Sequence, residues 1–207
     1  MFLLDNIVAE KKSEKKSKYD QRYKAAVDAA AAVFAEKSYH GCGTTDIAHK
    51  LNIKQGSLYY YFKSKEAALE AVCLMGITEQ ANFLAELISK ELSFAENIKA
   101  ITQFSLKSLR ENGDYIVVFN NDRKSIPLER RGKVREQSHN YHLMLMDIFR
   151  TGQEKGEIKA ELDILISVRA YTGLLSSASK WYHSEPTIDL AAVLNQFSEM
   201  FLNGAIK

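Results

Sequence analysis

The stretch NIKQGSLYYYFKSKE, residues 52–66, places amide, hydroxyl and ammonium groups at close spacing. The amide of Gln55 can donate to and accept from the edge of a base, and an ammonium such as that of Lys65 pairs with a phosphate. Tyrosine packs through its ring and hydrogen-bonds through its hydroxyl, which suits a boundary between two molecules. Gly56 permits close backbone approach. We interpret this stretch as a candidate nucleic-acid surface, which requires a short helix with a polar outer face.

The residues around this stretch predict a helix-turn-helix that would hold it. Asn52 ends the second helix in the role that Asn or Gly often plays after a last helical turn. Leu58 and Phe62 supply the inward contacts of the third helix. Ser64, followed by Glu66, marks the start of a long fourth helix. The four expected helices span 19 to about 37, about 44–51, about seven residues from Lys54 or Gln55, and 64 to about 90.

The remainder of the chain also has helical periodicity. Pro127 and Pro186 are its only prolines. Because proline is the residue that most strongly interrupts helices, we predict an all-α fold. The breaks between helices carry Gly, Pro or Asn together with charge. Five more helices are expected at about 93–112, 115–120, 127–155, 162–182 and 188–205, which gives about nine in total.

The positive charge is concentrated in the first third of the chain. Residues 1–65 carry 12 Lys and Arg against 7 Asp and Glu, a net charge of +5, and residues 66–207 carry the remaining 16 against 19, a net charge of −3. A locally basic segment on a nearly neutral protein favours a polyanionic partner for that segment. Residues 1–17 are expected to form a basic arm, either partly helical or disordered. A solvated lysine-rich tail is the alternative that needs no partner.

No pattern predicts an enzyme, a metal site or a cofactor. The sequence has no Ser/His/Asp arrangement, P-loop or dinucleotide-binding glycine motif. Glu136, His139 and His142 share a helical metal-ligand spacing, but no second cluster completes it, so we expect ordinary polar residues there. Cys42 and Cys73 form no paired framework, which fits a reducing, cytoplasmic setting. The N-terminal apolar run precedes the lysines, opposite to a signal peptide, and no apolar run approaches the roughly 20 residues that span a membrane.

The N-terminal third resembles the DNA-binding domain of the tetracycline-repressor (TetR) family of transcriptional regulators. The resemblance covers about a quarter of the chain with ungapped spacing, and it implies a DNA-binding domain at 18–66 and a larger helical domain for ligand binding and dimerisation at 67–207. The residues that carry it lie within 23–72: an amphipathic first helix with Phe34 near its end, Tyr39 in the next turn, TDIA, Gly56, LYYYF and KSKE.

The resemblance also implies which side chains contact DNA. In the family, the residues matching Tyr59 and Tyr60 contact the DNA backbone or bases. The lysine matching Lys65 contacts a phosphate. Packing alone is the alternative for each tyrosine, and the direction of Tyr61 stays open. With the polar face of the third helix and two threonines at the start of the second, the expected DNA-binding residues are Thr44, Thr45, Lys54, Gln55, Gly56, Ser57, Tyr59, Tyr60 and Lys65.

Two residues depart from the family pattern. Cys42 stands where the family usually carries a capping Thr or Ser, and Asn52 stands where Gly is common. Cysteine is a poor cap, so the second helix is expected to start at Thr44 or to be slightly less stable. A second interpretation gives Cys42 thiolate character and sensitivity to oxidant, because it lies near a helix N-terminus and a basic surface.

The closing stretch, residues 165–206, resembles more loosely a subgroup in which several members respond to acyl-CoA thioesters or related lipid metabolites. It implies a ligand cavity among the fourth to eighth helices and a two-fold interface, although packing within one chain would explain the same residues. Arg123, Lys124, Arg130 and Arg131 could hold an acidic ligand group or form a solvated basic loop. The expected ligand-binding residues are Phe83, Phe104, Arg123, Leu143, Met144, Ile148 and Tyr171, and the expected dimerisation residues are Gly173, Ser177, Trp181, Phe197 and Phe201.

We therefore expect a ligand-responsive DNA-binding regulator, most often a repressor in this family, that is released from its operator by a small molecule. A homodimer on a palindromic operator is expected, because one helix-turn-helix reads too few base pairs while a two-fold dimer reads two half-sites. A constitutive DNA-binding dimer without ligand control is the alternative. An enzyme with a fortuitous helix-turn-helix has no supporting motif.

Overall fold

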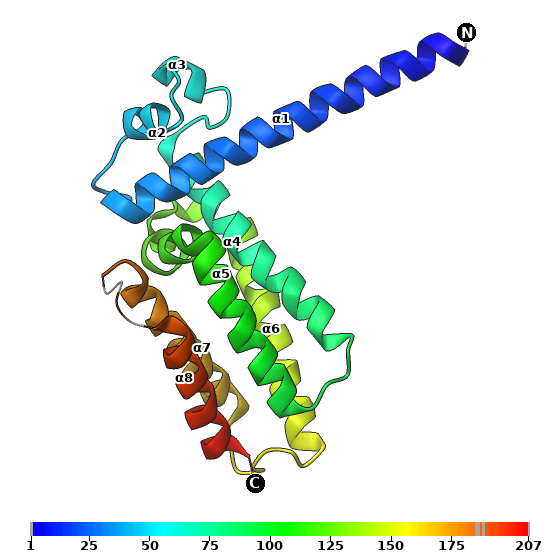
Figure 1. Ribbon diagram of the computed structural model, residues 1–207, viewed down its shortest axis with the longest axis vertical. Coiled ribbons are helices and arrows are strands. Elements are labelled where there is room, and N and C mark those ends of the chain that lie inside the picture. Colours follow the sequence, from blue (N-terminus) through cyan, green and yellow to red (C-terminus); the bar gives the residue numbers. More distant parts are fainter. Residues whose placement is uncertain (1, 185–186, 188, 207) are drawn as a thin grey trace.

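The chain folds into an all-α structure, which confirms the predicted fold class (Figure 1). The structure, a computed structural model, describes residues 2–184, 187 and 189–206, and it describes side chains for residues 17–180, 187 and 189–206. Within these residues there are eight α-helices, two short 3₁₀ turns and one isolated β-bridge between Ile158 and Ile206. The helix count is one below the nine expected, because two predicted helices are joined into one.

The first helix, α1 (Phe2–Lys37), is longer than predicted. It begins at Phe2 and not at Tyr19, because lysine, glutamate and alanine favour the helix and no Gly or Pro interrupts the segment. Figure 1 shows the N-terminal part of α1 projecting away from the other helices. The segment predicted as a separate arm is therefore continuous with α1.

The next two helices, α2 (Thr44–Lys50) and α3 (Gln55–Leu58), form the expected helix-turn-helix. α3 has four residues where about seven were expected. The backbone turns after Leu58, whose carbonyl oxygen accepts from the N–H of Tyr61 at 2.9 Å and from the N–H of Phe62 at 3.0 Å. Aromatic residues lose side-chain freedom in a helix, so three successive tyrosines favour this early end. We call α1–α3 the N-terminal unit.

The remaining helices form a bundle, in which α7 and α8 lie side by side along α5 (Figure 1). Ser64 caps α4 by accepting from the N–H of Ala67, as predicted. The helix predicted at about 127–155 starts at Gly132 and not at Pro127, because two 3₁₀ turns fill the connection after α5. The bundle consists of α4 (Lys65–Ile88), α5 (Phe94–Asp122), η1 (Arg123–Ser125), η2 (Leu128–Arg130), α6 (Gly132–Glu154), α7 (Ile164–Ser184) and α8 (Leu190–Ala205).

A kink in α5 joins the two helices predicted at 93–112 and 115–120. Asn112 has a non-helical backbone, with φ −135° and ψ 32°, and the helix continues on both sides of it. The side-chain amide of Asn112 donates to the carboxylate of Glu79 on α4, at 3.1 and 3.2 Å to its two oxygens. Asn112 therefore fastens α5 to α4 at the kink, and beyond the kink the hydroxyl of Tyr115 donates to Asp28 of α1.

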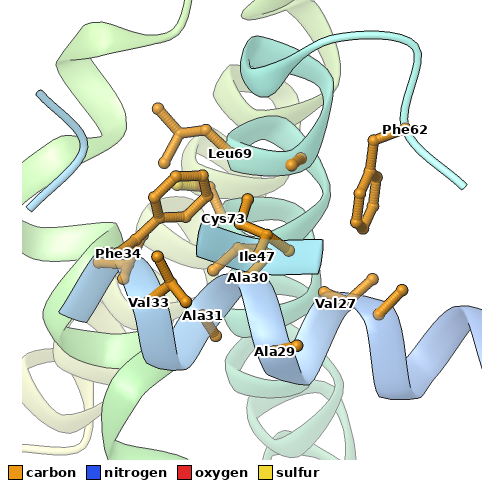
Figure 2. Close-up of a cluster of buried hydrophobic side chains, with 14 of the residues drawn as sticks. Val27, Ala29, Ala30, Ala31, Val33, Phe34, Ile47, Phe62, Leu69 and Cys73 are labelled. Carbon is orange, nitrogen blue, oxygen red and sulfur yellow. The ribbon is translucent and has the colours of Figure 1, made fainter. Parts of the chain in front are cut away.

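One hydrophobic core crosses from the N-terminal unit into the bundle. Figure 2 shows Phe34 of α1 close to Ile47 of α2 and Leu69 of α4. Ala26, Ala30 and Ala31 on α1 are fully buried, which permits close approach of the neighbouring helices. Burying a side chain as large as Phe34 contributes about 1.5–3 kcal/mol. The predicted boundary at residue 66/67 falls within the first turn of α4, so the two units share that helix.

Among the described residues, α4 alone is long and apolar enough by length and composition to cross a membrane, although no uninterrupted apolar run of that length occurs in the sequence. Its buried residues pack against α1, α5 and α6. It also carries glutamates, among them Glu66, Glu70 and Glu79. These features are those of the core helix of a helical bundle.

Candidate nucleic-acid interface and ligand cavity

The turn between α2 and α3 depends on Asn52. This residue has φ +55°, in the left-handed region. Its N–H donates to the carbonyl oxygen of His49, and the N–H of Ile53 donates to that of Ala48, both at 3.0 Å. This is the Schellman arrangement that ends a helix, and after Gly, Asn adopts it most readily. Asn52 therefore fills the role that Gly has in the family, and the departure leaves the turn intact.

The start of α2 is capped without Cys42. The N–H of Gly43 donates to Asp46 Oδ2 at 2.7 Å, and Asp46 Oδ1 accepts from Lys37 at 2.7 Å. The lysine and then the backbone N–H hold the pKa of Asp46 below its usual range. α2 starts at Thr44, as expected for a chain that lacks the family's capping residue at position 42.

The geometry of Cys42 favours a neutral thiol. Its Sγ donates to the carbonyl oxygen of Tyr39 at 3.7 Å. Burial raises the pKa of the thiol, against the smaller lowering effect of Lys65. Because the thiolate is the reactive form of cysteine, this environment opposes the oxidant-sensing interpretation.

The segment 54–62, which contains α3, divides into a buried side and an exposed side. Leu58 and Phe62 are 2% and 3% exposed and pack into the core. Lys54, Gln55, Gly56 and Ser57 are all exposed. A Cβ placed on Gly56 would meet nothing within 4 Å, so the space in front of this backbone is open. α3 thus turns a polar, low-relief face to the solvent, as a helix that enters the major groove must.

α2 and α3 are joined by a contact between two predicted DNA-binding residues. Gln55 Nε2 donates to Thr44 Oγ1 at 3.1 Å. This bond uses one of the two amide hydrogens and leaves the amide oxygen and the second hydrogen for a base edge. Thr45, on the same first turn of α2, is exposed.

The three tyrosines differ in exposure and in their partners. Tyr60 is 67% exposed and Tyr59 is 45% exposed, whereas Tyr61 is half-buried. The ring of Tyr61 stacks with that of Tyr19 on α1, with centroids 6.5 Å apart, and Tyr60 meets the same ring edge-on at 5.6 Å. The ring of Tyr61, whose direction the sequence left open, therefore lies against α1. The aromatic cluster holds the residues that follow α3 on α1.

Sequence reasoning missed the role of α1 in this cluster. Tyr23 lies one turn after Tyr19, with ring centroids 6.1 Å apart, and packs against Phe62 at 5.8 Å. The i, i+4 spacing of two tyrosines on a basic helix is the signal that could have found it.

Lys65 is held by the turn that precedes α2, residues 38–43, which we call the pre-α2 turn. Its Nζ donates to the carbonyl oxygen of Cys42 at 2.6 Å and lies 4.3 Å from the ring centroid of Tyr39. The hydroxyl of Tyr39 donates to Glu66 Oε1 at 3.0 Å. Burial, and then this carboxylate, raise the pKa of Tyr39 to about 12. An ammonium has three donors, so Lys65 can hold the turn and still reach a phosphate.

A cavity of about 330 Å³ lies between α4, α5, α6 and α7. Of the seven predicted ligand-binding residues, Arg123 alone lines it. Helical spacing identifies inward faces but not which inward side chains border a void. The lining residues are Gly76, Ile77, Gln80, Ser105, Leu109, Ile116, Phe119, Asn120, Arg123, Ser138, Tyr141, His142, Thr172, Leu175 and Ser176.

The other predicted ligand-binding residues lie elsewhere. The rings of Phe83 and Phe104 stack on each other with centroids 3.8 Å apart. The hydroxyl of Tyr171 is buried, donates to the carbonyl oxygen of Ile98 at 3.0 Å and lies 3.1 Å from Thr102 Oγ1. Three positions on α6 complete the set: Leu143 is 48% exposed, Met144 packs against the second core cluster, and Ile148 lines a separate cavity of about 400 Å³.

The predicted dimerisation residues do not all lie on the surface. Gly173 is exposed, and a Cβ on it would meet nothing within 4 Å. Ser177 is half-buried, and its hydroxyl donates to the carbonyl oxygen of Leu174. Phe197 and Phe201 are half-buried and pack inward; Phe201 lies 5.1 Å from the ring of Tyr171. The side chain of Trp181 lies outside the described residues.

The outer surface of the last two helices carries apolar residues that the sequence did not single out. Ile166 on α7 is 67% exposed, and Met200 on α8 is 61% exposed. Large exposed apolar side chains are candidates for a protein interface.

The predicted metal-like spacing does not form a cluster. His142 lines the 330 Å³ cavity, whereas His139 and Glu136 are exposed. In the part of the chain whose side chains are described, no group of three or more His, Cys, Asp or Glu residues could hold a metal ion.

Comparisons with known proteins agree with this arrangement. Residues 26–72 match the model of bacterial regulatory proteins of the tetR family, and residues 91–205 match the tetracyclin repressor-like C-terminal domain. The fatty acid metabolism regulator protein of Bacillus subtilis is 26% identical over 88% of this chain and 95% of its own length.

Two solved structures illustrate the shared fold. The ketosteroid transcriptional regulator KstR2 of Mycobacterium tuberculosis superposes with a TM-score of 0.80 at 20% identity, covering 90% of this chain and 95% of its own. FadR of Bacillus subtilis, solved in complex with stearoyl-CoA, superposes with a TM-score of 0.74 at 26% identity, covering 88% and 98%. Because the two family models together match both the helix-turn-helix and most of the bundle, the chain belongs to the TetR family of bacterial regulatory proteins.

Proposed function

We propose that this protein is a ligand-responsive transcriptional repressor that binds a palindromic operator as a homodimer in the cytoplasm. The observation that carries the proposal is the exposed polar face at the start of α3, formed by Lys54–Ser57, whereas Leu58 and Phe62 are buried. That face is presented by a helix-turn-helix in a chain that belongs to a family of bacterial regulators. The protein is a regulator and not an enzyme.

The DNA contacts follow from three adjacent segments. The start of α2, with Thr44 and Thr45, and the start of α4, with Lys65, would hold phosphates, because polar side chains at helix N-termini are suited to that role. Lys54, Gln55, Gly56 and Ser57 would meet base edges, and Tyr59 and Tyr60 the DNA backbone. We retain residues 18–66 as the DNA-binding domain, 67–207 as the effector and dimerisation domain, and 1–17 as a basic arm.

We propose that the effector is an acyl-CoA or a related fatty-acid metabolite that enters the 330 Å³ cavity. Support comes from the relative named as a fatty acid metabolism regulator and from FadR, which was solved with stearoyl-CoA. The cavity fits an amphipathic ligand, since aliphatic side chains such as Leu109 and Leu175 alternate with hydroxyl and amide groups.

Release from the operator would pass through α4. The helix lines the cavity with Gly76, Ile77 and Gln80, and its first residue, Lys65, bonds to the pre-α2 turn. A ligand that fits one position of α4 better than another shifts the equilibrium between them. Because the two recognition helices of a dimer must match the half-site spacing, a small displacement of α4 in each protomer reduces operator affinity.

The dimer interface is proposed on the outer surface of α7 and α8. The open space in front of Gly173 and the exposed side chains of Ile166 and Met200 support this location. Ser177 and Phe197 lie on the same helices. Phe201 would not contact the partner; it would support α8 by packing against the core.

Selection of bound genomic fragments by the purified protein tests the DNA-binding proposal. Selected fragments should share an inverted repeat, and Lys54→Ala should weaken their binding while the matched surface variant Lys133→Ala on α6 should not. Release is then measured by fluorescence anisotropy with acyl-CoAs, free fatty acids and aromatic compounds. A protein that selects no common sequence would contradict the proposed function.

The alternative, a constitutive DNA-binding dimer, makes a different prediction in the same assay. Its operator affinity would be unchanged by every compound, and no compound would raise its thermal midpoint. Thermal stabilisation together with operator release by one compound excludes this alternative.

A further inference from the structure

Arg123 lies where the cavity meets the connection to the N-terminal unit. It is the first residue of η1 and lines the cavity. Its Nη1 donates to the carbonyl oxygens of Phe119 and Asn120, at 3.0 and 2.8 Å, and the guanidinium lies 5.1 Å from the ring centroid of Phe119. These contacts fix the orientation of the side chain, and among the described side chains no carboxylate forms an ion pair with it, so its other N–H groups can bind a ligand.

The wall of the cavity has no negative charge to balance this cation. All its lining residues belong to the described part of the chain, and none of them is Asp or Glu. The remaining polar groups are hydroxyls, amides and the imidazole of His142. Because a guanidinium in a partly enclosed, low-dielectric site strongly favours an anion, the composition of the wall selects for an acidic ligand group.

The neighbouring basic residues are occupied by contacts within the protein. Arg130 forms an ion pair with Glu70 on α4 at 2.8 Å. Arg131 donates to the carbonyl oxygens of Ile126 and Lys124. Lys124 is exposed and does not line the cavity. Of the four basic residues grouped by the sequence around Pro127, Arg123 is therefore the one available to a ligand in the cavity.

The residues on either side of Arg123 contact the pre-α2 turn. Asp122 is 8% exposed and accepts a backbone hydrogen bond from Tyr39. Ser125 Oγ lies 3.2 Å from Nε2 of His40. The same turn leads directly into α2. A displacement of η1 therefore acts on the helix-turn-helix by a short route that does not use α4.

We propose that the effector carries an anionic group that pairs with Arg123, and that this pairing moves η1 and loosens its contacts with the pre-α2 turn. The inference rests on the proposed function and specifies its effector. The ligand is an amphipathic acid: an apolar body lies against the aliphatic wall, and a carboxylate or a phosphate meets the guanidinium. A free fatty acid would supply the first group and the nucleotide part of a CoA thioester the second.

Four probes with the same acyl chain separate these sources on the full-length wild-type protein. The fatty acid, its CoA thioester, its pantetheine thioester and the corresponding alcohol are compared by calorimetry. The comparison is made in three series, with butyryl, decanoyl and palmitoyl chains. At least one of the two charged probes should bind roughly tenfold or more tightly than the uncharged alcohol and pantetheine thioester, since one such contact is worth about 1.5–3 kcal/mol. An alcohol that binds as tightly as the charged probes overturns the proposal.

Arg123→Gln tests the named residue. The variant should lose the preference for the charged probe while it keeps the affinity for the uncharged ones, and Lys124→Gln is the matched control that should keep both. Operator affinity without ligand and the circular dichroism spectrum report whether the variant folds. If Arg123→Gln does not fold, Arg123→Lys keeps the charge, and the comparison of probes on the wild type still decides the charge requirement. Unchanged affinities in Arg123→Gln would refute the assignment.

Ser125→Ala tests the route to the DNA-binding end. This variant should bind the charged probe within about twofold of the wild type, but the probe should reduce its operator affinity several-fold less, out of a typical coupling of roughly 5–150-fold. Full release by Ser125→Ala refutes the η1 route. If the wild type binds no acyl probe at all, the proposed effector class fails and this inference fails with it, whereas binding without charge preference removes the inference alone.

Discussion

The N-terminal unit and the bundle share one hydrophobic core but differ in how much room they leave. Between α1, α2 and α4 the core contains fully buried alanines and closely packed larger side chains such as Phe34 and Leu69. The bundle contains two partly open cavities of about 330 and 400 Å³. A filled core transmits displacement, while a cavity can take up a ligand and change shape. The difference suggests a rigid DNA-reading unit that is moved by an adaptable effector domain.

The contrast predicts unequal costs for removing an apolar side chain. Phe34→Ala should destabilise the protein by about 3–5 kcal/mol, because the filled core cannot collapse into the space. Leu175→Ala, at the wall of the cavity, should cost about 1 kcal/mol, because this side chain is half-buried and already borders a void. Urea denaturation at a fixed protomer concentration measures both values. Equal costs would remove the distinction between the two regions.

The polar face of the N-terminal unit should separate sequence reading from phosphate binding. Gln55→Ala should change base preference at one position, with a loss of about 1–3 kcal/mol for the preferred base. Lys65→Ala should weaken all DNA sequences about equally and lower the salt slope by about one. Operator variants titrated at several salt concentrations give both quantities. The assignment of Gln55 fails if both substitutions cause equal, sequence-independent losses.

Lys65→Ala carries a structural effect that Lys65→Arg should avoid. The ammonium bonds to the carbonyl oxygen of Cys42 and lies over the ring of Tyr39, so its removal also frees the pre-α2 turn. If Lys65→Ala loses more DNA affinity than the loss of one phosphate contact explains, the excess measures this second, structural role. Arginine keeps the charge, the hydrogen bond and the cation–π contact.

The turn between α2 and α3 predicts a smaller effect with a clear sign. Asn52→Ala should cost about 1 kcal/mol, because alanine pays a steric penalty at φ +55° that asparagine tolerates better. Asn52→Gly should be neutral or slightly stabilising at the same position. Thermal unfolding of the two variants beside the wild type checks the order. A less stable glycine variant would show that the Asn52 side chain has a role beyond its backbone conformation.

The sequence predicted local features better than the cavity, because the two kinds of feature have different causes. The Ser64 cap, the left-handed Asn52 and the two sides of α3 depend on residues within a few positions of each other. The cavity depends on which inward faces of four helices fail to meet. Phe83 and Phe104 have the same inward spacing as lining residues, yet they stack on each other and close their part of the bundle.

Arg123 is the predicted ligand-binding residue that lines the cavity, and its charge restricts its possible environments in a way that does not apply to the apolar candidates. A charged residue beside a predicted helix end is rarely buried in a core without a partner, so it is either solvated or directed at a ligand. An apolar residue has no such restriction. The direction of Tyr61 escaped prediction because its partner, Tyr19, lies 42 positions earlier on α1, which was expected only to begin there.

The aromatic cluster gives the sharpest test of how α1 serves DNA binding. Tyr19→Ala removes ring contacts to both Tyr60 and Tyr61, each worth about 0.5–1.5 kcal/mol beyond buried area. Tyr19 itself is 39% exposed and is not among the proposed DNA contacts, so we expect any loss of operator affinity to come from a less ordered end of the recognition helix. We expect a loss of up to about tenfold for all sequences, with Tyr19→Phe close to the wild type because the contacts are made by the ring. If Tyr19→Phe weakens binding as much as Tyr19→Ala, the hydroxyl meets DNA directly and α1 belongs to the interface itself.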